Sequence, residues 1–255
     1  MRRRATLLAV ALCLGQLPTP AAAAPPTGPD RAVTVAPDHI TAGPDRAVAA
    51  PDRTTAGPGR IIGGETVTGP VPWAAALKIC TATLIAPRWV LTAAHCFLGP
   101  QPEFAVGEAD KSRGRRVVAA EAFNGGVGTD TRDLLLYRLA EPVAGATPVP
   151  LADADPPVGA EVRVYGWGRT CADCPGTTVM KTATMRVTTT AGTDYKRGPA
   201  IGSEAGTGRV AQGDSGGPMF HDGKLVGVTS MEYRGLSWHA SIARNRAWIR
   251  AITGR

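Results

Sequence analysis

The chain has 255 residues, a formal net charge of +7 and 44% hydrophobic residues. Residues 61–255 are long enough for one or two close-packed cores, and no segment after the first 24 residues is apolar enough to anchor in a membrane. The basic residues form no long stripe, so the charge does not call for a nucleic-acid partner.

The first 24 residues have the three parts of a secretory signal peptide. Met1–Arg4 is basic, Ala5–Leu17 is a short apolar run, and a stretch of small residues follows. This order is typical of a signal that is removed after Ala23 or Ala24, and its apolar run is too short to span a bilayer. We therefore expect a secreted, extracellular protein. The composition, rich in Ala, Arg and Gly, adds the expectation of a bacterial source.

Residues 25–60 are rich in Pro, Gly, Ala and Asp-Arg pairs and have few large apolar side chains. The run Gly28–Val33 recurs as Gly43–Val48. Such a segment cannot bury enough surface to offset its chain entropy. We expect a disordered propeptide over residues 25–60, with ordered structure from Ile61 onward.

Short apolar runs separated by glycine and proline predict an antiparallel β architecture, sandwich or barrel, for the ordered part. The Asp222-Gly223 pair is a hairpin signal, and only Asn245–Ile252 has helical spacing. Eight runs have the pattern of strands: Trp73–Ile79, Trp89–Ala93, Arg115–Ala120, Leu134–Leu139, Glu161–Gly166, Met180–Val187, Lys224–Ser230 and Gly235–Ile242.

Four of the five cysteines remain once the signal peptide, with Cys13, is removed: Cys80, Cys96, Cys171 and Cys174. An even number in an exported chain indicates two disulfides, for which three pairings are possible. The spacing of Cys171 and Cys174 also suits a pair of zinc ligands, but a second close pair is missing from the sequence. We therefore expect neither a metal nor another cofactor.

Three separated runs supply a nucleophile, a base and a carboxylate. Ser215 lies in a glycine-rich run, His95 ends an apolar run, and Asp133 precedes three leucines. A serine hydroxyl is a weak nucleophile until an imidazole takes its proton, and a buried carboxylate can fix the tautomer of that imidazole. Asp133 is favoured over Asp130 because it adjoins a buried apolar strand, whereas Asp130 lies in polar sequence.

With these runs the chain resembles the secreted chymotrypsin/trypsin-like serine proteases. The resemblance covers residues 61–255 and rests on four motifs in the family's order: Ile61–Gly64, Leu91–Cys96, Asp133–Leu136 and Gly213–Pro218. It implies an all-β fold of two six-stranded antiparallel β-barrels with a C-terminal α-helix. It also implies an active site between the barrels.

The resemblance gives each reactive group a role. His95 is the expected general base, Asp133 its orienting carboxylate, and Ser215 the nucleophile that forms an acyl-enzyme. The backbone N–H groups of Gly213 and Ser215 are the expected oxyanion hole. Ser230 matches a serine that supports the buried aspartate in the family.

The Arg60–Ile61 bond resembles an activation cleavage site. Cleavage there would free an ammonium at Ile61 that pairs with Asp214 and organises the oxyanion loop. The resemblance therefore implies a zymogen. The expected partners are a protein or peptide substrate, an activating protease that accepts arginine, and a protein inhibitor. Nucleic acid and, after signal removal, a membrane are not expected.

The resemblance also bears on the disulfides. It pairs Cys80 with Cys96, beside the histidine. Cys171 and Cys174 match no usual pair of the family, so we expect them to form a local clip within one loop.

The expected specificity pocket departs from the family pattern. Arg209 stands where trypsin-like members have an aspartate that selects Arg or Lys, and Glu232 where glycine leaves the mouth open. Ser230 borders this pocket, and Ser237 and His239 are expected near its base. Three arrangements remain open. Arg209 faces the pocket beside His239 and favours an acidic P1 side chain; it pairs with Glu232 and leaves a small pocket for short apolar residues; or it turns outward and selects nothing. Glu232 as an acidic selector would restore cleavage after Arg or Lys.

The predicted function is that of a secreted serine endopeptidase, and two alternatives stay open. The unusual pocket keeps open a non-catalytic protease homologue that binds a partner. The run Gly213–Gly217 also fits the nucleophile elbow of an α/β-hydrolase esterase. That fold needs the order Ser, acid, His and alternating strands and long helices, which the sequence lacks.

Overall fold

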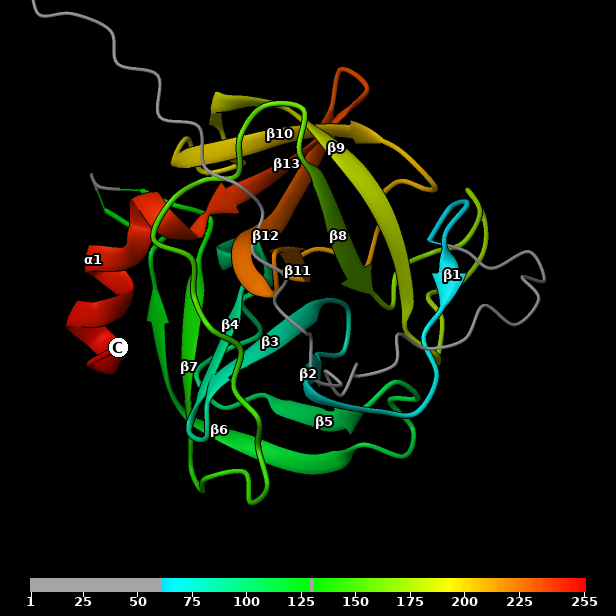
Figure 1. Cartoon of the computed structure of the whole chain (residues 1–255). Helices are drawn as coiled ribbons and strands as arrows, with labels where there is room; N and C mark the ends of the chain where they lie inside the picture. The colour runs from blue at the N-terminus through cyan, green and yellow to red at the C-terminus, as the bar shows by residue number, and fades with distance from the viewer. Residues whose placement is uncertain (1–60, 129–130) are drawn as a thin grey trace, which may run out of the picture. The chain divides into compact units, whose positions relative to one another are not determined.

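Figure 1 shows the computed structural model of the chain, in which residues 61–128 and 131–255 are described. The expected signal peptide, the expected propeptide with Arg60, and Asp130 lie outside the described residues. The described part contains thirteen strands, one short 3-10 turn and one α-helix. None of its helices has the length and apolar character needed to cross a membrane.

Six strands in the N-terminal half close into an antiparallel barrel in the order β2-β3-β4-β7-β6-β5 (Figure 1). Their bounds are Pro70–Ala76 for β2, Thr81–Ala86 for β3, Trp89–Thr92 for β4, Glu103–Glu108 for β5, Arg115–Asn124 for β6 and Leu135–Leu139 for β7. Phe104 and Tyr137 are fully buried inside it, with their ring centroids 5.4 Å apart. An edge-to-face pair of this kind adds about 0.5–1.5 kcal/mol to the free energy of area burial.

Six strands of the C-terminal half form a second antiparallel barrel in the order β9-β10-β13-β12-β11-β8, which the β8–β9 pairing closes. Their bounds are Glu161–Gly166 for β8, Lys181–Thr193 for β9, Pro199–Ala205 for β10, Pro218–His221 for β11, Lys224–Tyr233 for β12 and Leu236–Ser241 for β13. The two-residue strand β1, Glu65–Thr66, pairs with β9 outside this ring.

The expectation of two six-stranded antiparallel barrels is therefore confirmed. The α/β-hydrolase alternative is wrong, because that fold needs a largely parallel sheet, whereas the strands of both barrels pair antiparallel.

All eight predicted strands overlap observed ones, but β1, β3, β5, β10 and β11 were not predicted. All six residues of β3 are buried, so the strand lacks the alternation that marks a half-buried strand. β11 has only four residues and begins with a proline. The hairpin expected at Asp222-Gly223 joins β11 to β12, with φ values of 47° and 72° at these two residues.

The predicted C-terminal helix is confirmed as α1, Ile242–Thr253, three residues longer at its start than the predicted Asn245–Ile252. Its first turn is capped by Ser241, whose hydroxyl accepts the Arg244 N–H at 3.1 Å. Ile249 on its buried face packs with the core of the N-terminal barrel. The helix thus covers apolar surface that the barrel would otherwise expose.

The barrels are joined at β3 by hydrogen bonds that centre on Thr81. The Thr81 N–H donates across the seam to the Ser215 carbonyl at 2.8 Å. Within the N-terminal barrel, the Thr92 hydroxyl donates to the Thr81 carbonyl at 2.8 Å and so fixes Thr81. Farther along the same seam, the Trp167 indole donates to the Ala109 carbonyl at 2.8 Å. The seam holds the loop around Ser215 beside the end of β4, and the candidate site is built there.

Candidate active site

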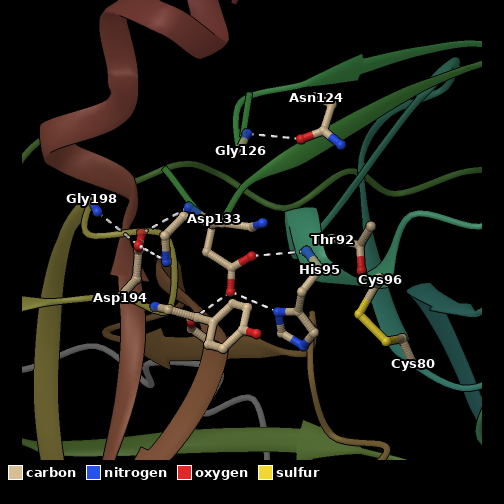
Figure 2. A network of polar contacts seen from close by, with 12 residues as sticks. Cys80, Thr92, His95, Cys96, Asn124, Gly126, Asp133, Asp194 and Gly198 are labelled. Carbon is tan, nitrogen blue, oxygen red and sulfur yellow. Dashed lines mark hydrogen bonds and ion pairs between the residues drawn. A yellow bond between two sulfur atoms is a disulfide. The ribbon is translucent and has the colours of Figure 1, made fainter. Parts of the chain in front are cut away.

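His95 lies in the 3-10 turn that follows β4, and two hydrogen bonds to Asp133 fix it (Figure 2). Its backbone N–H donates to Asp133 Oδ1 at 3.0 Å, and its Nδ1 lies 2.7 Å from Asp133 Oδ2. The Asp133 side chain is fully buried, while that of His95 is 25% exposed. Because an ionised carboxylate only accepts hydrogen bonds, this contact assigns the proton to Nδ1 and leaves Nε2 as an acceptor.

The buried carboxylate of Asp133 is held from a third direction by the C-terminal barrel. The Ser230 hydroxyl, on β12, donates to Asp133 Oδ2 at 2.5 Å. Hydrogen bonds to the charged form of a carboxylate offset part of its desolvation cost. Asp133 thus connects the two barrels and holds His95 in one orientation.

A second acid, Asp194, lies behind Asp133 and was not predicted from the sequence. Asp194 Oδ2 accepts the Asp133 N–H at 2.9 Å, and Asp194 Oδ1 accepts the N–H groups of Lys196 and Gly198 at 2.9 and 2.8 Å (Figure 2). Burial, and then the nearby Asp133, raise the pKa of Asp194 against the lowering effect of these hydrogen bonds. The polar run between β9 and β10 predicts a turn, but nothing local links that turn to Asp133.

The same turn reaches the other side of His95 through Tyr195. The Tyr195 N–H donates to the Ser230 hydroxyl at 3.0 Å. Its ring meets the His95 ring edge-on, with the centroids 5.5 Å apart, and the residue is 59% exposed. The turn therefore braces Asp133, Ser230 and His95 together.

Ser215 is fixed against the same strands that hold His95. Its carbonyl accepts from Thr81, and its neighbour Gly216 packs so closely that a Cβ there would overlap the Thr92 hydroxyl and the Thr81 carbonyl. No hydrogen bond joins the Ser215 hydroxyl to His95 among the described residues. Such bonds are often long before a substrate is bound.

The loop before Ser215 leaves two backbone donors free. In residues 61–128 and 131–255, neither the Gly213 N–H nor the Ser215 N–H donates to a protein acceptor. The Thr81 hydroxyl donates to the Gly213 carbonyl at 3.0 Å and accepts the Trp167 N–H at 3.2 Å. Two unpaired donors on a fixed loop can receive an anionic oxygen.

Asp214, between these two donors, is buried and has no cationic partner in the part of the chain that the structure describes. The Gly168 N–H and the Ala211 N–H each donate to its carboxylate at 2.8 Å, and no ion pair involves it within the described part of the chain. Burial raises the pKa of Asp214 to about 6. Ile61 is 1% exposed and belongs to the core of the C-terminal barrel.

Comparison with known proteins identifies the family. A family model described as Trypsin matches residues 61–243. Over 227 residues the chain is 30% identical to Trypsin 5G1 of Aedes aegypti, which covers 76% of this chain and 85% of that protein. The chain belongs to the trypsin family of serine proteases.

Other relatives agree with this assignment. The chain is 33% identical to serine protease 56 of Homo sapiens over 188 residues, which is 62% of this chain but only 31% of that protein. A solved structure of neuropsin, a serine protease expressed in the limbic system of mouse brain, matches with a TM-score of 0.61 and 25% identity. The match covers 71% of this chain and 93% of the neuropsin chain.

Beside Ser215 this trypsin-family chain has a small cavity of about 150 Å³. Ser230 and Glu232 line it, together with Val210, Ala211, Gln212, Thr229 and Met231. Arg209 does not line it; its Nη1 lies 3.1 Å from Glu232 Oε1 in a half-exposed ion pair. The Arg209–Glu232 pair is that of the second of the three arrangements left open above, and the P1 preference attached to it stays a prediction.

Two residues expected near the base of the pocket lie outside the lining of this cavity. Ser237 is buried, and its carbonyl faces the Ser203 hydroxyl. His239 is fully buried, with Nε2 3.0 Å from the Ser203 hydroxyl and Nδ1 3.2 Å from the Thr229 hydroxyl. Burial lowers the pKa of His239 to about 3, so this ring is neutral and offers no charge to a substrate.

The structure has two disulfides, Cys80–Cys96 and Cys171–Cys174. The first joins the start of β3 to the residue after His95, and the second closes a loop with a sequence separation of 3. Cys80, His95 and Cys96 lie close enough to suggest a metal site. The sulfurs of Cys80 and Cys96 form a disulfide, however, and so are not thiolate ligands.

Proposed function

We propose that this chain is a secreted serine endopeptidase that hydrolyses peptide bonds through Ser215, His95 and Asp133. The observation that supports this most is the hydrogen-bonded pair of buried Asp133 and His95 beside a docked Ser215. That pair leaves Nε2 of His95 free to accept a proton. The free N–H groups of Gly213 and Ser215 add a receiver for the developing oxyanion.

The proposed reaction has two halves. Ser215 Oγ attacks the scissile carbonyl carbon while its proton moves to His95 Nε2, and the oxyanion accepts hydrogen bonds from Gly213 and Ser215. The tetrahedral species then collapses, the C–N bond breaks, and His95 gives its proton to the leaving amine. Water repeats the sequence and releases the acid. A single oxyanion donor of this type contributes about 10²–10³ to kcat.

We further propose that the chain is made as a zymogen and is cleaved between Arg60 and Ile61 by another protease. The support is the buried Asp214, whose carboxylate has no cationic partner among the described residues to offset its desolvation, together with the burial of Ile61 in the core of the C-terminal barrel. The new ammonium of Ile61 would pair with Asp214 and fix the loop that carries Gly213.

For the P1 residue we propose a preference for short, uncharged side chains. The cavity beside Ser215 is small, at about 150 Å³, and Met231 is part of its lining. Glu232 is engaged by Arg209 and so is a poor selector for a basic side chain. Self-activation at Arg60 is then disfavoured, so we expect a separate activating protease. We also propose a protein inhibitor as a further partner.

Labelling with a fluorophosphonate probe tests the proposal. Protein that has been cleaved after Arg60 should label at Ser215, and uncut protein should label much more slowly. Ser215→Ala and His95→Ala should abolish labelling, whereas Thr147→Ala, at an exposed hydroxyl outside the site and the groove, should not change it. Absence of labelling in the cleaved protein would favour the non-catalytic homologue, and equal labelling of uncut protein would contradict the zymogen.

A further inference from the structure

Two neighbouring hollows lie between the oxyanion loop and the N-terminal barrel. The larger has a volume of about 680 Å³ and the smaller about 200 Å³, and both are lined by Leu77, Lys78 and Lys111. Gln212 and Gly213 line the smaller hollow, and Gln212 also lines the cavity beside Ser215. A chain seated in that cavity can therefore continue past the oxyanion loop into both hollows.

These hollows are predominantly cationic. Lys78, Lys111, Arg116 and Arg169 line them, and the only acid in the lining is Glu103. Glu103 is already paired with Arg116, at 3.3 Å. Within residues 61–128 and 131–255, no ion pair involves the other three cations. We name the two hollows with these four cations the cationic groove.

Lys111 is the cation best prepared for an anionic ligand. It is half-buried, and burial lowers the pKa of its ammonium. Its backbone N–H donates to the Thr178 carbonyl at 3.0 Å, which fixes the turn that carries it. A partly desolvated ammonium on a fixed backbone gains more from a carboxylate than a solvated lysine does.

Apolar side chains beside the cations favour a peptide over a free anion or a sulfated polysaccharide. Ile79 lines the smaller hollow and is 57% exposed, and Leu98 lines the larger and is 41% exposed. Exposed apolar groups next to lysines match a chain that alternates acidic and apolar residues.

We propose that the cationic groove binds acidic substrate residues on the leaving-group side of the scissile bond, at about the second to fourth positions after it. The inference rests on the proposed peptidase function and adds a substrate class to it: proteins with an acidic segment just after the cleaved bond. We infer the direction from the linings: Ser215 lines only the P1 cavity, Gln212 lines both the cavity and the smaller hollow, and Gly213 lines only the smaller hollow.

The test compares three peptides that have the same residues before the scissile bond. These residues are copied from a site at which the activated full chain cleaves denatured casein. Their second to fourth positions after the bond are Asp-Leu-Glu, Gln-Leu-Gln or Lys-Leu-Lys. We expect kcat/KM for the acidic peptide to exceed that for the lysine peptide by about ten- to a hundredfold at low salt, falling toward parity near 1 M salt. In Lys78→Gln/Lys111→Gln protein the preference should shrink to within about threefold. Lys224→Gln, an exposed lysine outside the groove, should retain it.

Labelling of Ser215 separates the two proposals. If the activated protein labels and cleaves but treats the three peptides alike, or if the double variant keeps the full preference, the groove proposal is overturned while the peptidase stands. If the three peptides were cleaved at equal rates and a heparin oligosaccharide bound tightly, the groove proposal would be overturned, and the groove would be a binding surface for polyanions. Without labelling or cleavage, both proposals fail.

Discussion

Replacing Thr81 by valine should lower kcat of the proposed peptidase by about 10–100-fold, with little change in KM. Thr81 is fully buried, and its hydroxyl bonds both to Gly213 in the oxyanion loop and to Trp167 in the neighbouring loop. Valine has the same shape and keeps the backbone bond to Ser215. The change therefore removes only the link between Gly213 and Trp167.

The magnitude follows from the two groups left without a partner. The Trp167 N–H is buried and costs about 1–3 kcal/mol when unpaired, and the part-buried Gly213 carbonyl costs about 0.5–1.5 kcal/mol. The free energy of unfolding should therefore fall by about 2–4 kcal/mol. The loop can relieve part of that cost by shifting, which moves the Gly213 donor away from the oxyanion and accounts for the loss in kcat.

The same strand supplies a matched control. Thr83 is as buried as Thr81, but its hydroxyl has no hydrogen-bond partner among residues 61–128 and 131–255. Thr83→Val should therefore leave kcat unchanged and maintain or raise stability. Thr81→Ser should restore kcat to within about threefold, because it restores the hydroxyl. The assay is steady-state kinetics with urea unfolding of each variant. If folded Thr81→Val protein had the kcat of Thr83→Val protein, the positioning role would be refuted.

Three further predictions follow from buried charges and from the pocket mouth. Burial raises the pKa of Asp214 to about 6 in the uncut chain, against about 3.9 in an unfolded one. The uncut fold therefore loses about 3 kcal/mol of stability as the pH rises between these values. Cleavage before Ile61 supplies the partner, so cleaved and uncut protein should differ more in Tm at about pH 7 than at about pH 4; a constant difference would argue against the pairing. Glu232→Ala should raise cleavage after large P1 residues relative to alanine, because the group that holds Arg209 is gone; an unchanged P1 profile in a peptide library would contradict a closing role. Asp194→Ala should lower the free energy of unfolding by about 3 kcal/mol, since three backbone N–H groups lose an acceptor worth about 1 kcal/mol each. It should also lower kcat; wild-type kcat and stability in that variant would exclude the bracing role.

The fold was predictable where burial follows a simple period. β8, Glu161–Gly166, alternates between exposed or half-buried and buried residues, and its predicted bounds were correct. β3 is buried on both faces because its residues serve the barrel interior on one side and the seam on the other. A strand of this kind lacks a period that sequence reasoning can detect.

The candidate site was predictable where its chemistry needs particular residue types in a local run. His95, Asp133 and Ser215 each stand in such a run. Asp194 and Thr81 do not, because their contacts lie 61 residues away at Asp133 and 132 residues away at Gly213. In the sequence, Asp194 is typical of a turn and Thr81 of a strand. Their contacts with the site form only in the folded chain.

One hairpin, β3–β4, contacts both the proposed base, His95, and the proposed nucleophile, Ser215. Its two ends are tied by the Cys80–Cys96 disulfide, and it carries His95 at its exit. Through Thr81 it also holds the Ser215 carbonyl, although Ser215 belongs to the opposite barrel. The spacing between imidazole and hydroxyl therefore depends on a few hydrogen bonds to one strand more than on the packing of two barrel cores. The absence of a side chain at Gly216 is then a requirement of docking, because a Cβ there would push the Ser215 loop off the hairpin. Gly216 thus helps to set the distance of the proposed nucleophile, Ser215, from the proposed base, His95.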